Sequence, residues 1–113
     1  MKKIVESISI AELGQMSEKM YDRLVKAVID IEKQVMVVDA ELHVDEEALL
    51  LEEGSEQKNL WGINLYPDKF GQKDWVEFDS MINLRPSQGN RSSSVENPAI
   101  QKRIVEIVAR FVK

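Results

Sequence analysis

The sequence contains no cysteine and only one histidine, His43. The lack of cysteine excludes disulfides, thiolate nucleophiles and cysteine-based zinc or iron–sulfur sites, and it favours a reducing compartment. Long hydrophobic runs are also missing: the longest, such as the segment 48–51, are far shorter than the roughly 20 residues of a membrane-spanning helix. No apolar segment follows Lys2 and Lys3, as it would in a secretory leader. We therefore expect a cytoplasmic protein without membrane contact.

Positive charge is scarce as well. The chain has 15 lysines and arginines against 20 acidic residues, which gives a net charge of −5 and a pI near 4.9. Binding to a nucleic-acid backbone depends on clustered basic residues, so nucleic acid is not an expected partner. A length of 113 residues with 43% hydrophobic residues is typical of one soluble domain with a modest core. We predict a single domain over residues 1–113.

Both ends of the chain carry helix signals. Ser9 is followed three residues later by Glu12, which fits a capping box and predicts a helix from about residue 10 to 22. Asn97 and Pro98 match the N-cap and first position of a closing helix. The apolar stripe of that helix comprises Ile100, Ile104, Ile107, Val108 and Phe111.

Between these helices, polar and apolar residues alternate with a period of two. The alternation predicts strands at residues 25–32, 36–45, 60–66 and 75–84. The segment 48–52 is apolar on both faces and predicts a further, central strand. Residues 1–8 are too short to assign, although Ile4 and Val5 fit an edge strand equally well as packing against the first helix. Short links between the strands favour an antiparallel meander.

These elements predict an α+β fold. Two amphipathic helices that bury their stripes on one face of a five-stranded, mainly antiparallel sheet form a two-layer domain of pattern αβββββα. The other face is then polar. Its predicted members are Asp30, Glu41, His43, Asn64, Tyr66, Asp79, Asn83 and Arg85.

The last predicted strand leads into a polar loop, residues 85–91, that has an arginine at each end. A guanidinium fork matches carboxylate and phosphate groups, and Gly89 leaves the backbone accessible, so we expect the loop to hold an anion. The alternative is that Pro86, Gly89 and Asn90 serve only to turn the chain. The ligand-binding residues predicted from the loop and the polar face are Asn64, Tyr66, Asn83, Arg85, Asn90 and Arg91.

The single histidine raises two further hypotheses. Alternation places Glu41, His43 and Asp45 on one strand face, where mixed oxygen and nitrogen ligands could approach a divalent metal. Because any solvent-facing strand shows acids at this spacing, we predict neither a metal nor another cofactor. An unperturbed imidazole titrates near pH 6.5, so His43 with Asp45 or Asp79 is the candidate pair for acid–base catalysis. No phosphate-binding or dinucleotide motif is present.

Two large apolar residues, Trp75 and Met81, fall on the predicted exposed face. Large exposed apolar groups tend to lie at interfaces, which indicates a partner surface or a homodimer. The alternative is that Tyr66, Trp75 and Met81 pack together across strands.

The segments 41–55 (ELHVDEEALLLEEGS), 60–67 (LWGINLYP) and 80–91 (SMINLRPSQGNR) resemble a family of small uncharacterised prokaryotic proteins, catalogued as a domain of unknown function. The resemblance implies a free-standing domain and assigns no activity and no catalytic residue. The leading hypothesis is therefore a binding or interaction domain that holds an anionic ligand or a protein partner. The alternatives are a small hydrolase-like enzyme, with or without a metal, and a structural homodimer.

Overall fold

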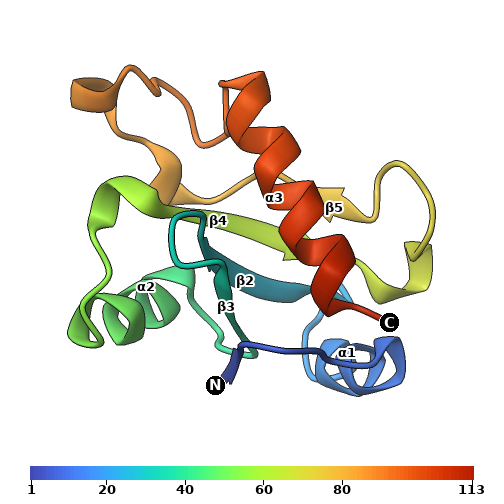
Figure 1. Cartoon of the computed structure of the whole chain (residues 1–113). Coiled ribbons are helices and arrows are strands. Elements are labelled where there is room, and N and C mark those ends of the chain that lie inside the picture. The colour runs from blue at the N-terminus through green and yellow to red at the C-terminus, as the bar shows by residue number, and fades with distance from the viewer.

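The computed structural model describes residues 1–113 as an α+β fold, as predicted. Its five strands form one antiparallel sheet in the order β1-β3-β2-β4-β5 (Figure 1). The strands are β1 (Lys2–Ile4), β2 (Val25–Asp30), β3 (Val35–Val38), β4 (Leu60–Leu65) and β5 (Val76–Glu77). The helices are α1 (Ile10–Ser17), α2 (His43–Glu52) and α3 (Pro98–Phe111).

The predicted caps of both terminal helices are confirmed. The Ser9 hydroxyl accepts a hydrogen bond from the Glu12 N–H at 3.0 Å, and α1 begins at Ile10. Asn97 caps α3 in the same way, accepting from the Ala99 N–H at 2.8 Å. The end predicted for the first helix is wrong, because α1 stops at Ser17 and residues 18–23 form turns.

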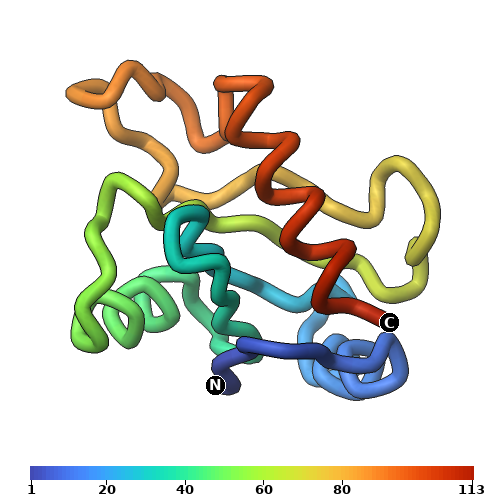
Figure 2. Tube along the Cα trace, viewed as in Figure 1, coloured from blue at the N-terminus to red at the C-terminus, as the bar shows by residue number.

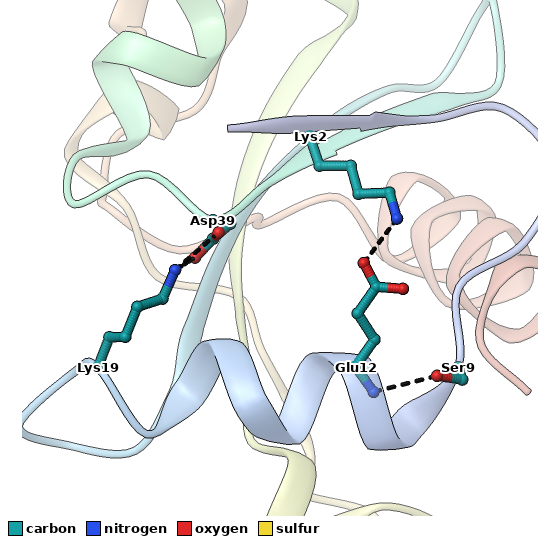
Figure 3. A network of polar contacts seen from close by, with 5 residues as sticks. All are labelled: Lys2, Ser9, Glu12, Lys19 and Asp39. Atoms are coloured by element: carbon teal, nitrogen blue, oxygen red, sulfur yellow. Dashed lines mark hydrogen bonds and ion pairs between the residues drawn. The ribbon is translucent and has the colours of Figure 1, made fainter.

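Ion pairs connect α1 to its neighbours, as Figure 3 shows. Lys2 in β1 lies 2.6 Å from Glu12, and Lys19 lies 2.7 Å from Asp39, just after β3. Such exposed pairs add little stability, so α1 is held mainly by the burial of Leu13 and Met16 against the main core. The end of α3 lies beside the start of α1 (Figure 2), where the Ile10 N–H donates to the Lys113 carbonyl at 3.0 Å.

The main core lies between one face of the sheet and helices α1 and α3. Leu13 from α1 and Phe111 from α3 are almost completely buried there against alternate residues of the strands. Those strand residues include Val25, Ala27, Ile29, Met36, Val38, Trp61, Ile63 and Leu65. The two terminal helices thus share one face, as the sequence predicts.

The strand predicted at 48–52 is wrong, because these residues belong to α2. The helix ends at a Schellman cap: Gly54 has φ +98°, the Ser55 N–H donates to Leu50 at 2.9 Å and the Gly54 N–H donates to Leu51 at 3.1 Å. The strand predicted at 36–45 is correspondingly short and ends at Val38. Helix α2 covers the second face of the sheet, where Leu50 packs on Val28, Val37 and Leu60.

The strand predicted at 75–84 is also mostly wrong. Only Val76 and Glu77 pair with β4, after which the chain leaves the sheet. Val76 and Phe78 pack against the main core, whereas Ile82 packs on the α2 side. This crossing requires Gly62 in β4, because a Cβ there would lie 2.6 Å from both side-chain atoms of Ser80.

The sheet is not a simple meander. Strand β4 follows β3 in the chain but pairs with β2, and the N-terminal strand β1 occupies the edge beside β3. Residues 2–4 are therefore the edge strand that the sequence left open. None of the three helices has the length and hydrophobicity needed to cross a membrane.

Candidate functional site

Asn83, a predicted ligand residue, is completely buried and pairs with the backbone of β4. Its Oδ1 accepts from the Gly62 N–H at 2.8 Å, and its Nδ2 donates to the Gly62 carbonyl at 2.9 Å and to Ser93 at 3.0 Å. The side-chain amide therefore replaces a neighbouring strand at a point that β5 does not reach. Its hydrogen-bonding groups are occupied within the fold.

Arg85 is also directed into the protein, with 8% of its surface exposed. Its guanidinium donates to the carbonyls of Ile82 at 2.9 Å, Gln57 at 2.6 Å and Leu60, and it lies 4.4 Å from the centre of the Trp61 ring. Burial lowers the pKa of this group, and the negative charge of Glu47 opposes that effect. Anion binding by Arg85 stays a prediction, but the geometry assigns these donors to the fold.

The loop 85–91 is turned mainly by Asn90. Its side-chain nitrogen donates to Asn83 at 2.7 Å and to Ser94 at 2.6 Å, and its Oδ1 accepts from the Glu96 N–H at 2.9 Å. Arg91 is exposed, whereas Arg85 is buried. The loop instead borders a hollow of about 310 Å³ that includes Lys58 and Trp61 but neither arginine.

A different hollow, of about 380 Å³, includes three of the predicted polar residues, His43, Asn64 and Asp79. It lies between the N-terminal end of α2, strands β2 and β4, and the segment that follows β5. We call it the α2 hollow. It is lined by Leu24, Lys26, Leu42, His43, Val44, Asn64, Asp79, Ser80, Met81 and Ile82.

His43 is the first residue of α2 and is not in a strand. Its Nε2 lies 2.7 Å from the carbonyl oxygen of Ile63 and donates to it, so the neutral ring presents Nδ1 as an acceptor. Burial lowers the pKa of His43, while the bond to Ile63 works in the opposite direction. The imidazole is therefore a neutral base at neutral pH.

Lys26 and Asn64 form the floor of the α2 hollow as directly opposed residues of β2 and β4. The Asn64 Nδ2 donates to Glu77 at 2.8 Å and to the Asp79 carbonyl at 3.1 Å, which fixes the orientation of the amide. Its Oδ1 is buried and has no hydrogen-bond partner. Lys26 takes part in none of the ion pairs of the structure. Both residues thus keep unused hydrogen-bonding capacity.

The N-terminus of α2 adds further free donors. No side chain caps this helix, and neither the His43 N–H nor the Val44 N–H has a hydrogen-bond partner. The N-terminal end of a helix carries a partial positive charge. The rim nearby is apolar and open: Leu42, Val44 and Met81 are 53%, 52% and 73% exposed. The hollow therefore combines polar donors with an unusually exposed apolar border.

The other predicted residues divide between this hollow and its surroundings. Asp79 lines the hollow with His43, whereas Asp45 and Glu41 border a separate depression on the far side of α2. Tyr66 lies beside the site and donates to Glu77 at 3.0 Å; burial and that carboxylate raise its pKa to about 12. Asp30, completely buried, is saturated by the Glu32 and Lys33 N–H groups and by the Ser55 hydroxyl.

The prediction that Glu41, His43 and Asp45 lie on one strand face is wrong. Glu41 precedes α2, and His43 and Asp45 are two residues apart on a helix, where they do not face each other. The structure contains no group of three or more histidine and acidic residues that could hold a metal ion. Trp75 and Met81, the two predicted exposed apolar residues, lie in different places. Trp75 packs against Phe70, with ring centres 5.0 Å apart, while Met81 borders the α2 hollow.

Sequence reasoning missed two residues that the structure brings forward. Lys26 alternates with the core residues of its strand, and its position directly opposite Asn64 is known only once β2 and β4 are paired. Glu46 is completely buried in α2, and burial raises its pKa to about 9. The sequence feature that indicates the helix around Glu46 is the acidic run 45–47 at the start of a segment rich in alanine, leucine and glutamate.

Comparison with known proteins agrees with the resemblance seen in the sequence. Neither the search of curated proteins nor the search of solved structures found a match. One family model matches residues 2–111, which is nearly the whole chain. The chain therefore belongs to the family described as "Protein of unknown function (DUF5674)".

Proposed function

We propose that this domain binds a small molecule with an acidic group and an apolar portion in the α2 hollow. The observation that carries the proposal is the juxtaposition of unused polar groups with exposed apolar side chains around one depression. Lys26, the free N–H groups of His43 and Val44, and the buried Asn64 oxygen all lack partners there. Ligand sites typically combine apolar walls with a few convergent polar groups.

The acidic group is assigned to the lysine side of the hollow. A carboxylate or phosphate oxygen near Lys26 would gain a charge-assisted hydrogen bond and the favourable field of the α2 N-terminus. The apolar portion would cover Leu42, Val44 and Met81, which are otherwise exposed to water. At roughly 25 cal/mol per Å² of apolar surface removed from water, this rim contributes favourably to binding.

Thermal unfolding in the presence of branched carboxylates and phosphorylated metabolites tests this function. A ligand at a hundredfold excess over its Kd stabilises the folded state by about 2.7 kcal/mol, so a binder raises the Tm clearly. We expect Lys26→Met to abolish the rise because it removes the charge and keeps the chain length. Lys73→Met is the matched control, because Lys73 is an exposed loop residue without an ion pair. If no acid raises the wild-type Tm, the proposal is wrong.

Catalysis is the second candidate function, because His43 and Asp79 line the same hollow. A neutral imidazole with a free Nδ1 is suited to accept a proton from a bound substrate or water. Any turnover at this site is expected to fall by a factor of 100 or more in His43→Ala, on the order of one general base, and to survive Asp45→Asn. Steady-state assays with ester and phosphoester substrates measure it. Activity that His43→Ala retains would remove His43 from the reaction.

A further inference from the structure

Asp79 adds a negative pole to the α2 hollow, in addition to the positive pole formed by Lys26. Its carboxylate is exposed at the edge of the depression and takes part in none of the ion pairs. The neighbouring Glu77 is different, because one of its oxygens accepts from both Asn64 and Tyr66. Glu77 therefore orients the Asn64 amide in the floor of the hollow, and Asp79 is the carboxylate that can contact a ligand.

The two poles lie on opposite sides of Asn64. Lys26 is in β2, Asn64 is its partner in β4, and Asp79 follows β5 on the far side of β4. The Asn64 amide is fixed by its donors to Glu77 and to the Asp79 backbone, so its Oδ1 is turned away from that side. A ligand across this floor would therefore meet a cation on one side of Asn64 and an anion on the other.

This arrangement matches a ligand that carries both charges. We propose that the α2 hollow takes a small zwitterion with an aliphatic side chain, that is, an apolar amino acid, whose carboxylate meets Lys26 and whose ammonium meets Asp79. The aliphatic group then covers the rim formed by Leu42, Val44 and Met81. This inference rests on the proposed function, since it names the chemical class of ligand for the same site.

Isothermal titration calorimetry with three related probes tests the inference. Leucine carries both charges, 4-methylpentanoate lacks the ammonium and isoamylamine lacks the carboxylate, while the aliphatic portion is nearly constant. We expect each truncated probe to bind the wild-type protein at least about tenfold more weakly than leucine, since each loses a hydrogen bond to a charged group.

Two variants identify the poles. Asp79→Asn is expected to bring leucine and 4-methylpentanoate to similar affinities, and Lys26→Met to do the same for leucine and isoamylamine. Asp74→Asn, which alters an exposed loop carboxylate paired with Lys69, is the control and should leave the order of the three probes unchanged.

The outcomes separate the inference from the proposed function. If 4-methylpentanoate binds the wild type as tightly as leucine, the hollow holds an acid with an apolar portion, and the zwitterion inference is wrong. If amino acids and simple acids all fail to bind, both proposals are wrong. If leucine binds best but Asp79→Asn leaves its advantage over 4-methylpentanoate intact, Asp79 is not the negative pole and the inference is overturned.

Discussion

Asn83→Ala is expected to destabilise the protein by about 3–5 kcal/mol, because it leaves the N–H and the carbonyl of Gly62 without partners inside the fold, each at a cost of about 1–3 kcal/mol. Asn83 is completely buried and makes three hydrogen bonds to backbone groups. Equilibrium unfolding in urea measures the loss. Small domains typically have a free energy of unfolding of about 5–15 kcal/mol, so a loss of this size would bring the protein close to unfolding.

The matched control is Asn59→Ala. Asn59 belongs to the short turn before β4, is partly exposed and makes no side-chain hydrogen bond, so its loss is expected to change stability by less than about 0.5 kcal/mol. Equal effects of the two substitutions would contradict the role assigned to the Asn83 amide. An m-value unchanged in both variants would show that stability changes without a change in the surface exposed on unfolding.

Glu46→Gln is expected to remove most of the decline in stability that the wild type shows as the pH rises. Burial raises the Glu46 pKa to about 9 from an ordinary value of 4.5, so between these values the folded state binds one proton more than the unfolded state. Stability then falls by about 1.4 kcal/mol for each pH unit in this window. Between pH 7 and pH 8.5, the wild type should lose about 2 kcal/mol that Glu46→Gln does not.

Glu46 is tested above pH 7 because the ionisation of His43 affects stability only at lower pH. Burial lowers the pKa of His43, so the unfolded state binds the proton more readily and stability falls when the pH drops below the ordinary value of 6.5. Unfolding in urea at a series of pH values measures both effects. Glu52→Gln is the control for Glu46, since Glu52 is exposed at the end of the same helix and its substitution should leave the slope unchanged. If the stability of Glu46→Gln falls with pH as steeply as that of the wild type, Glu46 ionises freely in the folded protein.

The elements that the sequence predicted well are those whose signals are local. Ser9 and Asn97 cap their helices through hydrogen bonds within three residues, and β2 and β4 direct alternate residues into the main core. In each case, the side chain that carries the signal contacts a group close in the chain or a large continuous core. The terminal helices and the two central strands could therefore be predicted without knowing the topology.

Helix α2 was missed because alternation was extended too far. Met36 and Val38 do alternate as strand residues, but Leu42 and Val44, which continue the pattern, lie 53% and 52% exposed at the start of a helix. Alanine, leucine and glutamate dominate residues 46–53, and these residues favour a helix by intrinsic propensity. The Schellman cap at Gly54 gave the same indication, but a glycine after polar residues also fits an ordinary turn.

The candidate site was only partly predictable for a topological reason. The sequence indicated a polar sheet face with His43, Asn64 and Asp79, and these three residues do line one hollow. Asn83, Arg85 and Asn90 have the same residue types, yet they hydrogen-bond to backbone groups 7 to 28 residues away. No pattern in the chain distinguishes an amide that pairs with a strand from one that meets a ligand.

The pairing of Asn83 and Arg85 with β4 has a consequence for self-association. Strand β5 covers only the end of β4, at Asn64 and Leu65, so the first half of a buried central strand would otherwise present free N–H and carbonyl groups. An uncovered edge of this kind is a template for a strand of another molecule and for aggregation. Asn83 at Gly62 and Arg85 at Leu60 occupy these groups with side chains that cannot be extended into a further strand. Asn83 and Arg85 therefore protect this part of β4 from pairing with a strand of another molecule.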